Sequence, residues 1–332
     1  MHRTFCFGRL FGNRIDAVPT SVLRRPYHGI VHCMLALSLC LMFLNLRLAA
    51  QNPALQENSA ATSGLVWNLP SGVAYRLDVR TAPRALRIHV LEIDLQQADL
   101  ELDVVAGNDP DGDGPVEATL APPLTLARSV HAFAAINTNA WSMFPDLETG
   151  KDPGYIVGGS ADIKGWLKIS ADQRSPLEAG YWSLWMDGGG NVQLGDVGGV
   201  DRGQYQDLGH ARWAISGFQG ILRDGKILRG QDEILHPRTA IGITPDSKKL
   251  IWMVVDGRQP GISEGVSEHE LAGLLQEFGA MEGINLDGGG SSVLLLADRD
   301  GRLRPANRPS GIGMRPVPSI LAIRSRRTDE KP

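Results

Sequence analysis

Two aspartates at the ends of apolar stretches carry the strongest chemical signal in this 332-residue sequence. Asp256 follows the run Leu250–Val255, and Asp287 follows Gly283–Leu286. Glycoside hydrolysis uses two carboxylates at separations of roughly 5–9.5 Å. Arg258 adds a forked cation suited to phosphate. The residues therefore predict paired acids beside an anion-binding loop.

The segment between the two aspartates predicts how they are positioned. Ser267 and Glu270 have capping-box spacing, and Glu270 is assigned to capping rather than to chemistry. Apolar residues then recur at helical spacing until Gly279. A strand, a short helix and a second strand form a βαβ unit, so the strands should be parallel and adjacent, about 4.8 Å apart. Both aspartates should then lie on one edge of the sheet, where open sheets hold ligands.

The loop after Asp287 has two interpretations. Asp-Gly is a common turn dipeptide and recurs at Asp187 and Asp224. The three glycines and two serines of Gly288–Ser292 exceed what a hairpin requires, and they allow a ligand to approach the backbone. Other candidates are Arg238, which precedes a strand over 241–244, and Asn137, whose amide suits a sugar hydroxyl or a strand-end cap.

Two further groups of residues give weaker indications of a functional site. Asp109, Asp111 and Asp113 match the first half of a calcium loop, but Leu120 stands where a bidentate Glu belongs. The sequence thus leaves a weak calcium candidate against an acidic surface loop, and it implies no organic cofactor. Ser291 lacks the closing glycine of a nucleophile elbow, which argues against a serine hydrolase.

The N-terminus predicts export. Residues 1–29 are arginine-rich, residues 30–44 are apolar, and small residues end the segment at Ala49-Ala50. This is typical of a signal peptide, and an uncleaved anchor that attaches the chain to a membrane through residues 30–48 is the alternative. All three cysteines lie before residue 50, so the remainder contains no disulfide, zinc-thiolate site or cysteine nucleophile. Residues 51–332 carry 27 basic and 36 acidic side chains, which argues against nucleic acid as a partner. We expect a periplasmic, cell-surface or secreted protein.

Strands and turns dominate the rest. Residues 86–95 and 99–105 alternate apolar and polar side chains and predict two paired strands. Asp187-Gly188 and Asp224-Gly225 predict hairpins. We expect a single α+β domain over 65–326 with a mixed, strand-rich sheet core, flanking helices and one βαβ unit that carries the site. A signal peptide or anchor (1–50) and a linker (51–64) precede it, and a polar tail (327–332) follows.

Four blocks in order resemble the phosphodiester glycosidase domain, the family of the mannose 6-phosphate uncovering enzyme. They are His236-Pro237-Arg238-Thr239-Ala240-Ile241-Gly242, Asp256-Gly257-Arg258-Gln259, Glu270-Leu271-Ala272 and Asn285-Leu286-Asp287-Gly288-Gly289-Gly290-Ser291-Ser292. Pro153–Val157 and the closing Arg315-Pro316-Val317-Pro318 are also similar to the family. The family usually has Asn-Gly and then aromatics where this chain has Asn137–Trp141, which suggests a different substrate choice.

The resemblance implies hydrolysis of a sugar-1-phosphodiester of a glycan or glycoconjugate, which frees the sugar. Asp287 would stabilise or attack the anomeric carbon or activate water, with Asp256 as its partner or as an orienting group, and which of the two is the nucleophile stays open. The resemblance also implies substrate- and phosphate-binding residues, namely Arg238, Arg258, His236, Thr239, Gly288, Gly289, Gly290, Ser291, Ser292 and Asn137. Two alternatives stay open: a non-catalytic envelope protein that binds or assembles polysaccharide, and a phosphoesterase that releases the alcohol.

Overall fold

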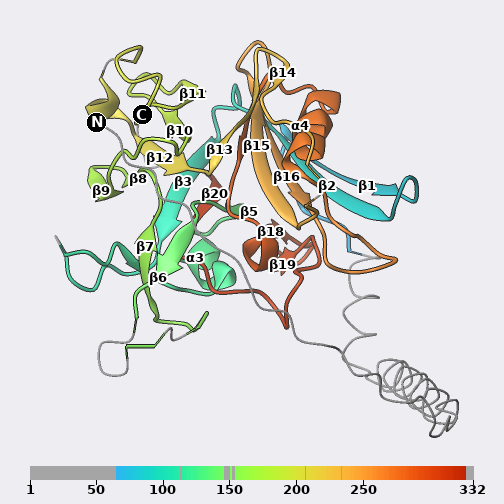
Figure 1. Cartoon of the computed structure of the whole chain (residues 1–332), viewed down its shortest axis with the longest axis horizontal. Helices are drawn as coiled ribbons and strands as arrows, with labels where there is room; N and C mark the ends of the chain where they lie inside the picture. The colour runs from blue at the N-terminus through green and yellow to red at the C-terminus, as the bar shows by residue number, and fades with distance from the viewer. Residues whose placement is uncertain are drawn as a thin grey trace, which may run out of the picture. The chain divides into compact units, whose positions relative to one another are not determined.

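The computed structural model describes residues 65–326 except 113, 146–149, 152–153, 206 and 233. The predicted leader (1–50), linker (51–64) and tail (327–332) lie outside the described residues. Within these bounds the chain forms four antiparallel β-sheets and two α-helices, α3 (Pro123–Ser129) and α4 (Glu268–Glu277) (Figure 1). Neither helix is long and apolar enough to cross a membrane.

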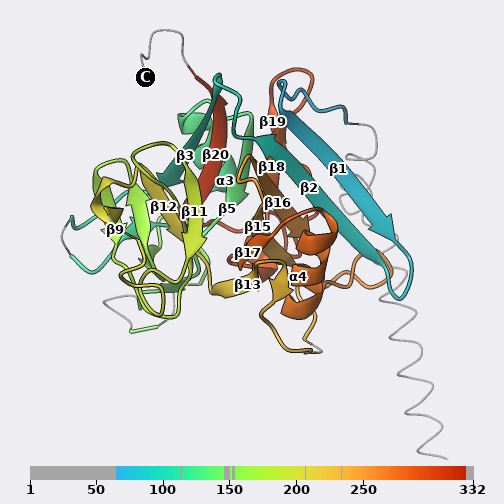
Figure 2. The same ribbon diagram turned by 90° about the horizontal axis from the view of Figure 1, so that it is seen from above.

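The largest sheet has seven strands and carries α4 on one face (Figure 2). Its strand order is β1 (Val73–Arg80), β2 (Leu86–Asp94), β16 (Lys249–Val255), β15 (Arg238–Ile243), β17 (Glu282–Asn285), β13 (Gln219–Arg223) and β14 (Lys226–Ile227). The predicted capping box of α4 is confirmed, because Ser267 accepts from the Glu270 N–H and Glu270 accepts from the Ser267 N–H.

Strand β16 explains how a continuous apolar run fits an antiparallel sheet. Leu250, Trp252 and Val254 pack into the main core, whereas the alternate side chains face the core beneath α4. A strand covered on both faces requires apolar residues at every position, whatever the direction of its neighbours. The apolar run therefore reports burial rather than parallel pairing.

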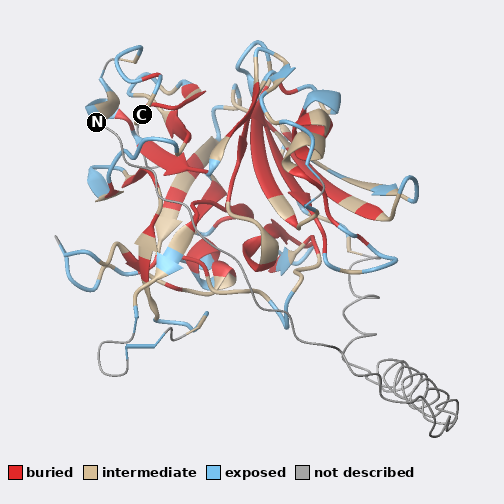
Figure 3. Ribbon diagram, in the orientation of Figure 1, coloured by how far each residue is buried: buried red, intermediate tan, exposed pale blue. Residues whose placement is uncertain are grey.

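Three further sheets complete the fold, and buried residues concentrate on their strands (Figure 3). One five-stranded sheet has the order β19 (Leu303–Pro305), β18 (Leu294–Ala297), β5 (Ala134–Asn137), β20 (Ser319–Ser325) and β3 (Leu100–Ala106). The other has the order β11 (Val192–Gly195), β10 (Ser183–Met186), β12 (Trp213–Ser216), β8 (Leu167–Ile169) and β9 (Asp172–Ser175). The small sheet contains β4 (Ala118–Thr119), β7 (Ser160–Ile163) and β6 (Trp141–Met143). Short 3₁₀ turns are η1 (Leu208–His210) and η2 (Gly289–Ser291).

The expected α+β class is wrong, because the fold is mostly β and its sheets are antiparallel rather than mixed. The βαβ prediction is wrong in placing its two strands next to each other. Strand β15 lies between β16 and β17 and pairs antiparallel with both. The two flanking strands still run in the same direction, so their carboxyl ends share one edge with the amino end of β15.

Local turn signals were more reliable than long-range pairing. The hairpins at Asp187 (β10–β11) and Asp224 (β13–β14) are confirmed. The stretches 86–95 and 99–105 do form strands, β2 and β3, but these lie in different sheets rather than pairing with each other. Turn chemistry is local, whereas strand pairing depends on where each apolar face finds its core.

Candidate functional site

Three strand ends meet at one edge of the seven-stranded sheet. Asp256 follows β16, Arg238 opens β15, and Asp287 lies two residues beyond β17. The backbone N–H of Asp287 donates to the carbonyl of Thr138, 2.9 Å away, at the end of β5. The edge of one sheet and the end of another therefore define the site.

Asp287 is half-buried at the centre of this edge. Burial raises the pKa of its carboxyl to about 6, and Ser291 and the Arg315 charge act in the opposite direction. The neighbouring indole of Trp141 also lowers this pKa. An acid with a pKa near 6 can exchange protons close to neutral pH, as catalytic carboxyls do.

Asn137 fixes the backbone of Asp287. Its Nδ2 donates to the Asp287 carbonyl at 2.6 Å, and its Oδ1 accepts from Thr239 Oγ1 at 2.9 Å and Val293 N at 3.0 Å. Both Asn137 and Thr239 are buried. The structure therefore places these two predicted binding residues beneath the site, where they join β5 to β15 and to the Asp287 loop.

The glycines after Asp287 allow cations to approach the backbone. A Cβ on Gly290 would lie 2.4 Å from Arg315 Nη2, and one on Gly289 would lie 3.3 Å from Arg258 Nη1. Gly289 also has φ +60°, which favours glycine. Its N–H donates to the Pro237 carbonyl at 2.8 Å. The loop thus brings two guanidinium groups together rather than presenting this N–H to a ligand.

Arg258 and His236 form a second pair at the site. Arg258 Nη2 donates to His236 Nδ1 at 3.2 Å, so the imidazole is neutral and carries its proton on Nε2. Burial, and the charges of Arg258 and Arg238, lower the pKa of His236. His236 can therefore donate one hydrogen bond from Nε2 to an anion at neutral pH.

Arg238 is held by the start of α4. Its Nη1 lies 3.4 Å from Glu268 Oε1, and its Nε donates to the Val266 carbonyl at 3.3 Å. Glu268 also pairs with Arg229 at 2.9 Å and accepts from Asn285 at 3.2 Å. Arg238 thus lies beside the glycine loop with much of its charge already compensated.

Arg315 is a site residue that the sequence analysis placed only within a family-like block. Its guanidinium carbon lies 3.8 Å from the centroid of the Tyr155 ring, and Tyr155 meets Trp141 edge-on at 5.5 Å. Among the described residues, neither Arg315 nor Arg258 takes part in an ion pair, in contrast to Arg238. Two guanidinium groups without acidic partners beside one loop are typical of an anion site.

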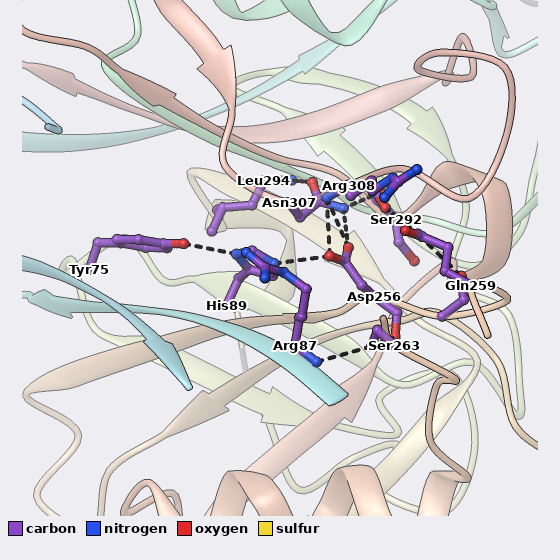
Figure 4. A network of polar contacts seen from close by, with 11 residues as sticks. Tyr75, Arg87, His89, Asp256, Gln259, Ser263, Ser292, Leu294, Asn307 and Arg308 are labelled. Atoms are coloured by element: carbon purple, nitrogen blue, oxygen red, sulfur yellow. Dashed lines mark hydrogen bonds and ion pairs between the residues drawn. The ribbon is translucent and has the colours of Figure 1, made fainter. Parts of the chain in front are cut away.

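Asp256 is bound within a buried hydrogen-bond network (Figure 4). Its oxygens accept from Asn307 Nδ2 at 3.1 Å and from the Arg308 N–H at 3.0 Å, and Oδ2 lies 3.1 Å from His89 Nε2. The chain continues from His89 Nδ1 to the Tyr75 hydroxyl at 2.8 Å. Asp256 therefore connects β1 and β2 to the loops that carry Arg258 and Arg315.

The two serines have different surroundings. Ser291 Oγ accepts from Arg315 Nη1 at 3.5 Å and lowers the pKa of the Asp287 carboxyl. The Ser292 carbonyl accepts from Asn307 Nδ2 at 3.1 Å, while the buried Ser292 Oγ has no partner among the described residues. Ser291 thus contributes directly to the environment of Asp287, and Ser292 links the loop to the Asp256 network.

The calcium candidate forms a turn. Asp109 Oδ1 accepts from Gly112 N at 2.8 Å, Asp111 Oδ2 accepts from Val116 N at 3.2 Å, and Asp113 lies outside the described residues. Across the part of the chain that is described, no group of three His, Cys, Asp or Glu side chains is arranged to hold a metal ion.

Comparison with known proteins agrees with this geometry. Residues 187–324, which include most of the site, match the phosphodiester glycosidase family. A hypothetical protein from Synechocystis aligns with TM-score 0.55 and 15% identity over 78% of this chain, which spans 63% of that protein. The zebrafish N-acetylglucosamine-1-phosphodiester alpha-N-acetylglucosaminidase catalytic domain, auto-inhibited by its pro-peptide, aligns with TM-score 0.53 and 20% identity, over 78% of this chain and 85% of that one.

No curated protein matches the chain. At these identities the two solved structures establish a shared fold, and the family match covers the region from the Asp187 hairpin to β20. The resemblance inferred from the four sequence blocks is thereby confirmed, because residues 187–324 match the phosphodiester glycosidase family.

Proposed function

We propose that the protein is an exported hydrolase that cleaves the bond between the sugar and the phosphate of a sugar-1-phosphodiester and frees the sugar. The observation that carries the proposal is one half-buried carboxyl, Asp287, beside two guanidinium groups, those of Arg258 and Arg315, that form no ion pair within the described part of the chain. The family match and the activity that the zebrafish enzyme is named for support this substrate class.

The proposed chemistry uses one carboxylate. The C1–O bond breaks, the oxygen leaves on the phosphate monoester, and charge develops at the anomeric carbon in an oxocarbenium-like state. Asp287 stabilises or attacks that carbon, or activates the water that does. A phosphate monoester is a weak base, so strong acid assistance at the leaving oxygen is not required.

The phosphate is assigned to the cationic side of the site. Arg258 and Arg315 approach the loop at Gly289 and Gly290, and His236 Nε2–H supplies a neutral donor. Preorganised donors of this kind contribute several kcal/mol where charge develops. Asp256 and Asn137 act as positioning residues in this proposal, because their side chains are bound within the protein. The proposal requires no metal and no organic cofactor.

The natural partner is proposed to be a glycan or glycoconjugate with a sugar-1-phosphodiester. Export is proposed from the basic and apolar pattern of residues 1–50. The acidic charge balance of residues 51–332 is consistent with a partner other than nucleic acid.

The test is to incubate the protein with a panel of sugar-1-phosphodiesters and to identify the products by mass. Release of free sugar, abolished by Asp287→Ala in a folded protein, supports the proposal. Asp187→Ala is the matched control, because Asp187 begins the same Asp-Gly-Gly-Gly sequence but bonds only its own turn. Release of the alcohol with sugar phosphate retained would identify a phosphoesterase, and binding without turnover would identify a binding protein.

A further inference from the structure

Two adjoining cavities lie at the end of the strands remote from the Asp287 site. The larger, about 660 Å³, is lined by Asp94, Glu101, Lys168, Gly190 and Trp213 among others. The smaller, about 390 Å³, shares Asp103, Ser170, Arg212 and Trp213 with it. Both volumes lie within the range of small-molecule sites.

Strand β20 separates the two regions. Its first residue, Ser319, bonds Thr138 at 2.7 Å beside Asp287, whereas Arg324 and Ser325 at its other end line the smaller cavity. Six residue steps along a strand span about 20 Å. The cavities therefore form a location separate from the proposed catalytic site.

Three cations line these cavities without forming an ion pair among the described residues: Lys168, Arg212 and the exposed Arg326. Two of them, Lys168 and Arg212, donate to backbone carbonyls. Lys168 is only 7% exposed, and its ammonium group donates to the Gly209 carbonyl. Arg212 Nη2 donates to the Gly188 carbonyl at 3.0 Å. In the described part of the chain neither cation forms an ion pair, although buried lysines are rarely left without an anion.

The acidic side chains of the wall form ion pairs or hydrogen bonds with other groups. Arg324 pairs with both Asp103 and Glu101, and Asp94 accepts from Gln97 Nε2 at 2.9 Å. Among the described residues, none of these acids forms an ion pair with Lys168 or Arg212. The wall also offers a hydroxyl at Ser170 and apolar surface at Trp213.

We propose that these cavities form a second saccharide site, in which Lys168 and Arg212 bind the phosphate or carboxylate group of an anionic sugar. Charged donors recognise the oxyanion. The carboxylates and the Ser170 hydroxyl accept or donate hydrogen bonds to ring hydroxyls, and the volume admits more than one sugar ring. The site does not depend on the hydrolytic function proposed for Asp287.

The experiment is calorimetric titration of the full chain with glucose 6-phosphate, glucuronate, glucose and inorganic phosphate. The background is Arg258→Gln/Arg315→Gln, so that the catalytic edge does not contribute phosphate binding. Glucose 6-phosphate or glucuronate should bind, and Lys168→Met/Arg212→Gln should weaken that binding by about tenfold or more. The tighter binder of glucose 6-phosphate and glucuronate identifies whether the site prefers a phosphate or a carboxylate.

The proposal would be overturned if glucose or inorganic phosphate bound as tightly as the anionic sugars, or if neither anionic sugar bound. Unchanged affinity in the Lys168→Met/Arg212→Gln variant would also overturn it. Thermal unfolding checks that each variant is folded. In the otherwise wild-type chain, Lys168→Met/Arg212→Gln should leave hydrolysis of a small sugar-1-phosphodiester unchanged. Failure of this site and failure of the proposed hydrolysis are therefore separate outcomes.

Discussion

Asp256 Oδ2 lies 3.1 Å from Nε2 of His89, and both side chains are fully buried. The contact links the end of β16 to β2, and through Asn307 it reaches the loop that follows Asp287. One of the two aspartates that the sequence paired for catalysis is thus bound inside the protein, and the other remains available to substrate.

Replacing Asp256 by Asn should destabilise the protein and reduce turnover only moderately. An amide nitrogen in place of Oδ2 would face His89 Nε2 and the Arg308 N–H, so we expect unfolding free energy to fall by about 2–3 kcal/mol. Denaturant unfolding and sugar-release kinetics measure both effects. His89→Gln, which can still donate to Asp256, should be milder. A loss of about 10³-fold or more in kcat at unchanged stability would instead assign Asp256 to the chemistry.

Removing Arg315 should impair hydrolysis strongly. Arg315→Met deletes a cation that contacts the glycine loop and forms no ion pair with any described residue, so kcat/KM should fall by about 10²–10³-fold. Steady-state kinetics with a sugar-1-phosphodiester provides the measurement. Arg302→Met is the control, because Arg302 forms only an exposed pair with Asp300 and should retain full activity. Wild-type kinetics in Arg315→Met would remove Arg315 from the phosphate site.

The pH dependence of kcat/KM should report Asp287. Its pKa of about 6 predicts that activity rises with pH and levels off above about 7, because the carboxylate is the active form. The Arg315 charge lowers this pKa, so Arg315→Met should move the midpoint to higher pH. A profile that falls between pH 5 and 7 would mean that the protonated acid acts.

Stability should show the opposite pH dependence at this residue. The folded pKa of Asp287 lies above the value of about 3.9 for an unfolded chain, so the folded state favours the protonated form. Its contribution is intact below pH 4 and is lost as pH rises through 6. At pH 8 the free energy of unfolding of Asp287→Asn should therefore exceed that of wild type by about 1–2 kcal/mol after allowance for partial exposure, and its unfolding temperature should be higher. The difference should vanish near pH 3.5. A difference that is the same at both pH values would contradict this explanation.

Features that depend on neighbouring residues could be predicted from the sequence alone. The capping box at Ser267, the Asp-Gly hairpins at Asp187 and Asp224, and the four family blocks could all be read without coordinates, because caps and turns depend on side chains a few residues apart. Asp287, Arg238 and Arg258 were also gathered correctly at one sheet edge, since β16 and β17 do run in the same direction.

Tertiary structure decided what lies between those strands and where each side chain points. Periodicity cannot distinguish a parallel strand from an antiparallel strand buried on both faces, so β15 was not placed between β16 and β17. His89, Asn307 and Arg315 come from distant segments and carry no local signal of their roles. Only the packing of the sheets brings His89 and Asn307 against Asp256 and brings Arg315 against Gly290. This packing makes Asp256 a positioning residue and leaves Asp287 beside Arg258 and Arg315, which form no ion pair among the described residues.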